Sequence, residues 1–186
     1  MSAEETPKIL FQPTGSIACF KACDLVSRLA KRGITVQTVA SAGALRFVGP
    51  ATLEGLTGRS PFTDLYEPGR TMDHIRLARW ADLALLCPAT ANSMNRLAAG
   101  LADDAIGALF LAWELGRKPY LVAPAMNATM WDHPATRAAR ERLEKFGARL
   151  LPVGDGRLAC GEQGEGRLLE VEELEKHVLQ AMAGAR

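Results

Sequence analysis

The chain has 186 residues, 48% of them hydrophobic and 23% charged, and its 22 Lys and Arg against 21 Asp and Glu give a net charge of +1. These values predict one globular domain with a buried core, and they argue against a protein whose main task is electrostatic binding of nucleic acid or a membrane surface. The apolar runs are far shorter than the roughly 20 residues that span a bilayer. The first ten residues contain no apolar signal segment. We therefore expect a cytoplasmic protein that binds neither nucleic acid nor membrane.

The predicted elements alternate between short apolar strands and amphipathic helices. In chain order, strands are expected at 8–11, 34–39, 83–87, 120–123 and 148–151, and helices at 17–32, 44–47, 92–99, 103–115, 136–146 and 171–182. In the first helix, Ala18, Ala22, Leu25 and Leu29 recur at three- and four-residue spacing, and Gly33 follows as a stop signal.

This alternation predicts a single α/β domain over residues 1–186, built as a three-layer, doubly wound parallel sheet of the Rossmann-like or flavodoxin-like kind. Ligands of such folds bind at the carboxyl ends of the strands. The residues that follow each predicted strand are therefore the informative ones. Polar residues and glycines follow four of the strands, in the segments 14–17, 41–43, 88–92 and 124–127.

Three of these segments place hydroxyl side chains where a helix is expected to begin: Thr14-Gly15-Ser16, Ser41, and Thr90-Ala91-Asn92-Ser93. Each alone is explained by an ordinary helix N-cap. Neither G-x-G-x-x-G nor the phosphate-loop motif is present, which argues against a standard dinucleotide or nucleoside triphosphate site. Three such helix starts on one edge of a sheet favour a different anionic cofactor.

The segment Pro124-Ala125-Met126-Asn127-Ala128-Thr129-Met130-Trp131 carries more varied side chains than a plain strand-to-helix connection requires. The simpler interpretation makes Met126, Met130 and Trp131 core residues at helical spacing. That interpretation leaves Asn127 unexplained.

Among the histidines, His74 follows a loop and precedes the third predicted strand. A lone histidine is more often structural than catalytic, but imidazole is also the side chain most easily set near neutral pH for proton transfer. His133 and His177 lack a comparable context and are expected to be structural.

Four cysteines are scattered without a C-x-x-C pair, which argues against a zinc site and against a disulfide scaffold. Cys19, Cys23 and Cys87 are expected to be buried core residues. Cys160 instead lies in the segment 154–167, which has five glycines within thirteen residues. We interpret that segment as a mobile flap, with an exposed hairpin as the alternative. A thiol placed there suggests a chemical use.

Together these segments resemble the homo-oligomeric flavin-containing cysteine decarboxylases. The resemblance extends from Thr14-Gly15-Ser16-Ile17-Ala18 to Gly166-Arg167, and it rests mainly on the 124–131 segment, the residues around His74, Pro88-Ala89-Thr90-Ala91-Asn92 and Leu158-Ala159-Cys160-Gly161. It implies FMN as the cofactor and a homo-oligomer, either a trimer or a dodecamer of trimers, with FMN at the subunit interfaces. The implied activity is decarboxylation of 4'-phosphopantothenoylcysteine to 4'-phosphopantetheine in coenzyme A biosynthesis.

The resemblance also assigns roles to individual residues. The catalytic residues would be His74, supplied to the flavin of a neighbouring subunit, Asn127, which would hold the substrate carboxylate, and Cys160, which would donate a proton from the flap. The cofactor-binding residues would be Gly15, Ser16, Ile17, Ser41, Thr90, Ala91, Asn92, Ser93 and Ala125. The substrate-binding residues would be Asn127, Met130, Arg157, Leu158 and Ala159. No metal is expected.

The chemistry of decarboxylation is consistent with these roles. Loss of CO₂ from a cysteinyl carboxylate leaves a carbanion, so an electron sink has to be made first. Flavin can take a hydride from the cysteine side chain to give a thioaldehyde, which delocalises the charge as CO₂ leaves. The resulting enethiol then takes back a hydride from the flavin and a proton from an acid.

The sequence departs from the family in two segments, and three alternatives remain. The segment Phe11-Gln12-Pro13 before Thr14 is unusual and is expected to adjust the flavin loop. Members of the family often continue after the last Gly-Arg with Met-Ala-Glu-Pro, whereas here Arg167 is followed by Leu168-Leu169-Glu170-Val171. Many bacterial relatives carry a fused synthetase, so for a chain ending at Arg186 we expect a separate synthetase to supply the substrate. The alternatives are a peptidyl-cysteine decarboxylase, a flavin prenyltransferase and a non-catalytic regulatory flavoprotein. The Pro-Ala-Met-Asn segment argues against the second, and the joint presence of His74, Asn127 and Cys160 argues against the third.

Overall fold

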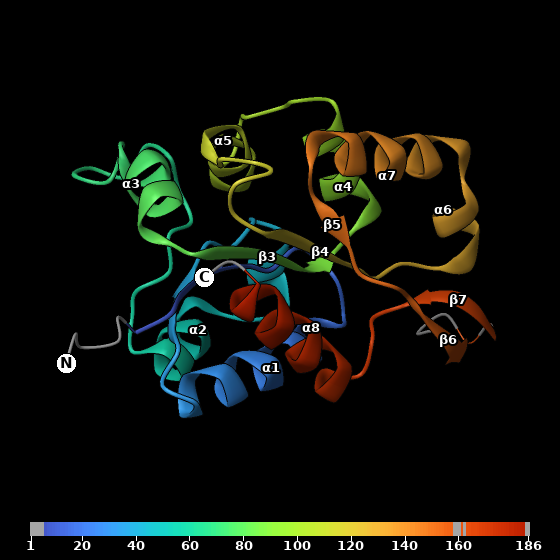
Figure 1. The fold of residues 1–186 in the computed structure, drawn as a ribbon, viewed down its shortest axis with the longest axis horizontal. Coiled ribbons are helices and arrows are strands. Elements are labelled where there is room, and N and C mark those ends of the chain that lie inside the picture. Colours follow the sequence, from blue (N-terminus) through green and yellow to red (C-terminus); the bar gives the residue numbers. More distant parts are fainter. Residues whose placement is uncertain (1–5, 158–160, 162, 185–186) are drawn as a thin grey trace.

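The computed structural model describes residues 6–157, 161 and 163–184. A five-stranded parallel sheet with the order β2-β1-β3-β4-β5 crosses the middle of the molecule (Figure 1). Its strands are β1 (Lys8–Gln12), β2 (Thr35–Thr38), β3 (Leu83–Ala89), β4 (Tyr120–Pro124) and β5 (Arg149–Leu150). The fold is therefore the doubly wound parallel sheet that the sequence predicts.

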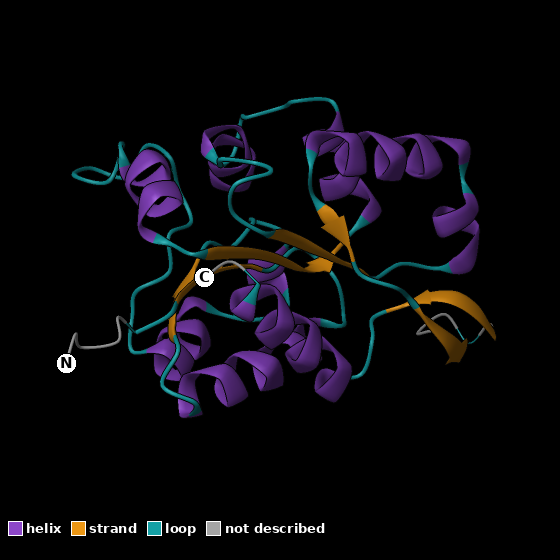
Figure 2. Ribbon diagram, viewed as in Figure 1, coloured by secondary structure: helices purple, strands orange, loops and turns teal. Residues whose placement is uncertain are grey.

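Helices cover both faces of the sheet, as the purple layers on either side of the orange strands in Figure 2 show. The α-helices are α1 (Cys19–Lys31), α2 (Pro50–Thr57), α3 (Asp73–Trp80), α4 (Ala91–Ala98), α5 (Ala105–Ala112), α6 (Ala128–Asp132), α7 (Pro134–Phe146) and α8 (Val171–Ala183), and a short 3₁₀ helix covers Ala44–Arg46. Helices α1, α2 and α8 pack on one face, and α3, α4, α5 and α7 pack on the other.

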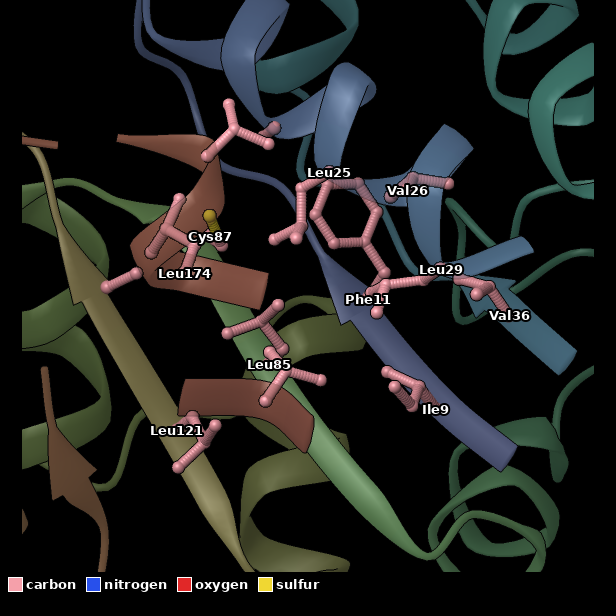
Figure 3. Close-up of a cluster of buried hydrophobic side chains, with 14 of the residues drawn as sticks. Ile9, Phe11, Leu25, Val26, Leu29, Val36, Leu85, Cys87, Leu121 and Leu174 are labelled. Carbon is pink, nitrogen blue, oxygen red and sulfur yellow. The ribbon is translucent and has the colours of Figure 1, made fainter. Parts of the chain in front are cut away.

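Alternate side chains of each strand enter two separate cores, because successive residues of a strand point to opposite faces. Ile9 and Phe11 of β1 pack with Leu85 and Leu121 against α1 and α8 (Figure 3). Leu10, between them in sequence, packs on the opposite face with the residues of α4 and α5. Each fully buried side chain of this size contributes roughly 1.5–3 kcal/mol of transfer free energy, so these two cores hold the sheet rigid beneath its loops.

A two-stranded antiparallel hairpin lies outside the main sheet. It consists of β6 (Gly154–Arg157) and β7 (Gln163–Arg167), and it lies beyond the end of β5, next to α6 (Figure 1). Residues 154–157 and 163–167 of the glycine-rich segment therefore form a hairpin, and the mobility of this hairpin as a flap stays a prediction.

The predicted elements agree with the structure except for three helices and some boundaries. Helices α2, α3 and α6 were not predicted, and the first helix begins at Cys19 rather than at residue 17. The predicted helix at 103–115 is shorter, and the one at 44–47 is a single 3₁₀ turn. Among the described residues, no helix is both long and apolar enough to cross a membrane.

Candidate active site

The loops that follow the parallel strands gather at one edge of the sheet, and two of them leave in opposite directions. From β1 the chain passes to β2 on one side, whereas from β3 it passes to β4 on the other. Loops that separate in this way open a crevice beyond the carboxyl ends of the two strands, which is where ligands of such folds bind. The candidate site is therefore expected between the loop after β1 and the loop after β3.

Thr14 holds these two loops together. Its buried hydroxyl donates a hydrogen bond to the carbonyl oxygen of Pro88 at 2.6 Å and accepts one from the backbone N–H of Thr90 at 3.0 Å. Its own N–H also donates to the Pro88 oxygen, at 3.3 Å. The relative position of the two loops is thereby fixed by one side chain.

The loop after β2 approaches the loop after β1 very closely at two glycines. A Cβ atom added at Gly15 would lie 3.1 Å from the Cα and carbonyl carbon of Gly43, closer than nearly all ordinary contacts. Ser41, at the start of the second loop, donates its hydroxyl to Pro13 at 3.3 Å and accepts from the N–H of Ala44 at 3.1 Å. The absence of side chains at both glycines therefore brings Ser41 beside the first loop.

The helix starts in these loops leave backbone N–H groups available to a ligand. Thr90 caps α4 by accepting from the N–H of Ser93 at 3.3 Å, and the two hydroxyls lie 3.1 Å apart. Ser16 accepts from Ala18 at 3.2 Å, while Ile17 has 59% of its surface exposed.

No described residue accepts a hydrogen bond from the N–H groups of Gly15, Ile17, Ala91 or Asn92. Unpaired donors at helix starts are the usual protein groups for holding a phosphate. These residues therefore fit the phosphate of an anionic cofactor such as FMN.

The segment after β4 combines a core contact with a helix cap. Trp131 is buried, with Arg140 stacked 3.7 Å from its ring centre, whereas Met130 is 48% exposed. Asn127 is the N-cap of α6, because its Oδ1 accepts from the N–H of Met130 at 3.0 Å. Ala125 is buried and donates its N–H to Ala89 at 2.9 Å. The core interpretation thus holds for Trp131 but not for Met130, and Asn127 has a structural task in addition to any ligand.

The hairpin packs directly on this segment through β7. The N–H of Met126 donates to the carbonyl oxygen of Gly166 at 2.9 Å. A Cβ at Gly166 would lie 2.6 Å from the Met126 oxygen, and one at Gly164 would lie 2.9 Å from the Cβ of Ala128. Two glycines therefore allow the hairpin to reach the candidate site. The backbone of Arg157 ends β6, whereas Leu158, Ala159 and Cys160 lie outside the described residues.

His74 is the second residue of α3, on a helix that the sequence analysis did not predict. Only two residues separate the end of α3 from the start of β3. The C-terminus of α3 therefore lies at the amino edge of the sheet, and its start lies toward the carboxyl edge. The Nδ1 atom is buried, and no described residue bonds to it. His74 takes no part in the hydrogen bonds that join the loops after β1, β3 and β4. Its assignment to a neighbouring subunit stays a prediction.

The cysteines near the sheet are structural. Cys19 and Cys87 are buried and Cys23 is partly buried. Burial raises the pKa of Cys23 to about 11 and also raises the pKa of Cys19 and of Cys87. These thiols are therefore neutral near pH 7, as expected of core residues. Within the described part of the chain, no cluster of His, Cys, Asp and Glu could hold a metal ion.

Two contacts of the site were not predicted, although both residues lie in segments that the sequence had marked. Gly43 belongs to the segment 41–43, but its contact with Gly15, which sets the width between two loops, was not foreseen. Gln12, at the end of β1, is fully buried and accepts a hydrogen bond from the hydroxyl of Tyr120, while its Nε2 has no partner among the described residues. Neither contact has a local signal, because each joins residues far apart in the chain.

Comparison with known proteins agrees with this arrangement. The chain is 41% identical over 174 residues to the coenzyme A biosynthesis bifunctional protein CoaBC of Mycolicibacterium smegmatis. This alignment covers 94% of this chain and 41% of that protein. It is 39% identical over 170 residues to CoaBC of Bacillus subtilis, covering 90% of this chain and 41% of the relative. The chain thus spans about two fifths of the length of these curated relatives.

Solved structures match nearly the whole chain. A PPC decarboxylase mutant complexed with pantothenoylaminoethenethiol superposes with a TM-score of 0.83 at 29% identity, covering 95% of this chain and 98% of the other. The FMN-dependent cysteine decarboxylase SpaF superposes with a TM-score of 0.81 at 30% identity, covering 98% and 99%. The sequence pattern of the Flavoprotein family matches residues 2–183 of this chain. Because that match covers almost every residue, the chain belongs to the Flavoprotein family.

Proposed function

We propose that this protein is an FMN-dependent decarboxylase that converts 4'-phosphopantothenoylcysteine to 4'-phosphopantetheine in coenzyme A biosynthesis. The observation that carries the proposal is the 41% identity to a CoaBC protein over 94% of the chain. The structural likeness to a PPC decarboxylase with a pantothenoylaminoethenethiol bound supports the same reaction. The match to CoaBC covers part of that bifunctional protein, so the source of the substrate, including a separate synthetase, stays a prediction.

In this proposal the loops after β1, β2 and β3 hold FMN. The unpaired N–H groups at residues 15, 17, 91 and 92 would bind its phosphate, together with the hydroxyls of Ser16, Ser41, Thr90 and Ser93. Ala125, which is buried against Ala89, would line the ring. When bound, the flavin supplies an electron sink that accepts two electrons from the cysteine moiety and later returns them.

The residues of this chain would bind the substrate and move its protons. Asn127, beside the docked hairpin, would hold the substrate carboxylate, and Met130 would line the pocket from the exposed side of α6. His74 would take the proton that leaves as the cysteine side chain is oxidised, and Cys160 would protonate the enethiol. Residues 154–167 would cover the substrate and exclude water, with Arg157, Leu158 and Ala159 as further contacts.

A homo-oligomer forms part of the proposal, because His74 is assigned to the flavin of a neighbouring subunit. We propose a trimer, or a dodecamer built of trimers, located in the cytoplasm. Light scattering that gave the mass of a single chain for the flavin-loaded protein would exclude this arrangement.

A second candidate is the decarboxylation of a C-terminal cysteine in a peptide. SpaF, an FMN-dependent cysteine decarboxylase, superposes over 98% of this chain, which supports a cysteinyl substrate of another kind, such as a peptide. The identity to SpaF is 30%, against 41% to CoaBC, so we rank the peptide reaction second.

The proposed reaction is tested by supplying the flavin-loaded protein with 4'-phosphopantothenoylcysteine and weighing the product. We expect a product lighter by one CO₂ and fully reduced, and we expect the His74→Asn variant to bind FMN but form little product. The His177→Asn variant is the matched control, since His177 lies within α8 and outside the loops that form the candidate site. Recovery of unchanged substrate from the flavin-loaded wild type would contradict the proposal.

A further inference from the structure

Arg70 makes an unusually dense set of contacts just before α3. Its Nε donates to Oδ2 of Asp73 at 2.8 Å, and its Nη1 donates to the carbonyl oxygen of Pro61 at 3.1 Å and to Oε2 of Glu67 at 3.2 Å. Its guanidinium also lies over the ring of Phe62, with Cζ 4.9 Å from the ring centre. The side chain is 22% exposed, so these contacts are partly shielded from water. Arginine alone offers enough donors in a rigid plane to make all of them at once.

The segment that Arg70 contacts is attached to the end of β2. Phe62 is fully buried, its N–H donates to Thr38 at 2.9 Å, and its carbonyl oxygen accepts from Ala40 at 3.1 Å. Ser41, the polar residue of the loop that approaches Gly15, follows Ala40 directly. Arg70 therefore joins the start of α3 to the carboxyl edge of the sheet.

The start of α3 carries His74, directly after the residue that Arg70 holds. Asp73, the first residue of α3, is bound to Arg70 both through its carboxylate and through its N–H, which donates to the Arg70 carbonyl at 2.8 Å. The Nδ1 atom of the neighbouring His74 is buried without a partner among the described residues. A histidine that lacks a hydrogen bond at this nitrogen depends on packing and on its backbone for its direction.

We propose that Arg70 is a positioning residue for His74: it fixes the first turn of α3 against the end of β2, so that the imidazole keeps one orientation. The proposal rests on the proposed function, in which His74 takes part in the reaction. Removal of Arg70 would also leave the carboxylates of Glu67 and Asp73 near one another without the cation between them, which would push the helix start away from the Pro61–Phe62 segment.

Arg76 provides a matched control on the same helix. Its Nε lies 3.4 Å from Oδ1 of Asp73, so Arg76 pairs with the same carboxylate as Arg70, but the Arg76 side chain is 65% exposed. Arg76→Ala therefore removes the same charge from the same acid, yet it leaves the contacts with Pro61 and Phe62 in place. Arg70→Lys keeps the charge of Arg70 but offers a single nitrogen, which cannot reach all of the acceptors.

The test combines histidine NMR with steady-state kinetics on the flavin-loaded protein. His74 is assigned in ring-labelled protein by comparison with His74→Asn, and His177 serves as the internal reference. We expect Arg70→Ala to shift and broaden the His74 ring signals while those of His177 stay unchanged. Because small misplacements of a reacting group are costly, we expect kcat to fall on the order of 10- to 100-fold with KM changed by no more than about twofold. Arg70→Lys should recover part of both losses, and Arg76→Ala should match the wild type.

Several results would overturn the positioning role. Unchanged His74 signals in both Arg70 variants would do so, as would a loss in Arg76→Ala equal to that in Arg70→Ala. If Arg70→Ala does not fold, Arg70→Lys decides the question by the same two readouts. A wild-type protein without decarboxylase activity would refute the proposed function, whereas the NMR comparison would still report whether Arg70 orients His74.

Discussion

At the scale of single residues, the candidate site depends on side chains that also hold the fold together. The hydroxyl of Thr14 joins the loops after β1 and β3, and Thr90 is both its partner and the cap of α4. A buried donor or acceptor that loses its partner costs about 1–3 kcal/mol, so a substitution at Thr14 would disturb both loops at once. A variant is therefore informative here only if it keeps the structural contact and changes the chemistry.

Asn127 allows such a separation. Its Oδ1 caps α6, and an aspartate caps a helix as well as an asparagine does. Asn127→Asp should therefore keep the melting temperature of the wild type, while its negative charge repels the substrate carboxylate and raises KM at least about 10-fold. Melting curves and steady-state kinetics measure the two effects.

Asn127→Ser is the control for this variant, because serine retains a cap without adding a charge. A KM for Asn127→Asp equal to that of the wild type would remove Asn127 from the carboxylate site. A large fall in melting temperature with Asn127→Asp would show that the cap had not been preserved.

At the scale of elements, the hairpin is placed by glycines on β7. Gly166 has a φ of +121°, which residues other than glycine rarely adopt, and it lies against the carbonyl oxygen of Met126. Gly156 on β6 has a similar φ of +138°, but a Cβ there would meet only the end of the flexible Arg167 side chain, at 3.3 Å. The two positions thus have comparable backbone strain but different contacts.

Gly166→Ala should therefore displace the hairpin from the segment after β4, whereas Gly156→Ala should not. We expect KM for the substrate to rise about 10-fold or more in the first variant and to change much less in the second, because only the first loses the packing that holds the substrate cover in place. Steady-state kinetics on the two flavin-loaded variants measure the difference. Equal KM values for the two variants would show that the hairpin position does not affect substrate binding.

The elements also show how far a single sequence can predict this fold. The five strands were predicted because each is a short apolar run at a spacing that leaves room for a helix. Helices α2 and α3 were missed because they are only eight residues long and have no side-chain N-cap. Helix α6 was missed because its cap, Asn127, was interpreted as a ligand residue.

The same limit applies to the site. The rule that ligands bind beyond the carboxyl ends of parallel strands directed attention to the loops that the structure gathers at one edge of the sheet. The contacts that shape them, Thr14 with Pro88 and Gly15 with Gly43, join residues that lie far apart in the chain. No local pattern predicts such pairs, because they arise only when the sheet order is known. Arg70 was missed for the same reason. Its partner Phe62 pairs with Val39, directly after β2, and no local pattern predicts that pairing.

At the scale of the whole molecule, the fold alone does not choose between substrates. Structures of a PPC decarboxylase and of SpaF, a cysteine decarboxylase, superpose on this chain with TM-scores of 0.83 and 0.81. The higher identity to CoaBC proteins favours the small phosphorylated substrate over a peptide. A site built for one of these substrates should discriminate strongly, because polar groups that meet no partner on the wrong substrate are costly to bury.

Competition between the two substrates is the most direct measurement. The flavin-loaded protein is given equal concentrations of 4'-phosphopantothenoylcysteine and a peptide with a C-terminal cysteine, and both decarboxylated products are followed by mass spectrometry. We predict a kcat/KM at least roughly 100-fold higher for the phosphopantothenoyl substrate. Faster decarboxylation of the peptide would contradict the proposed function.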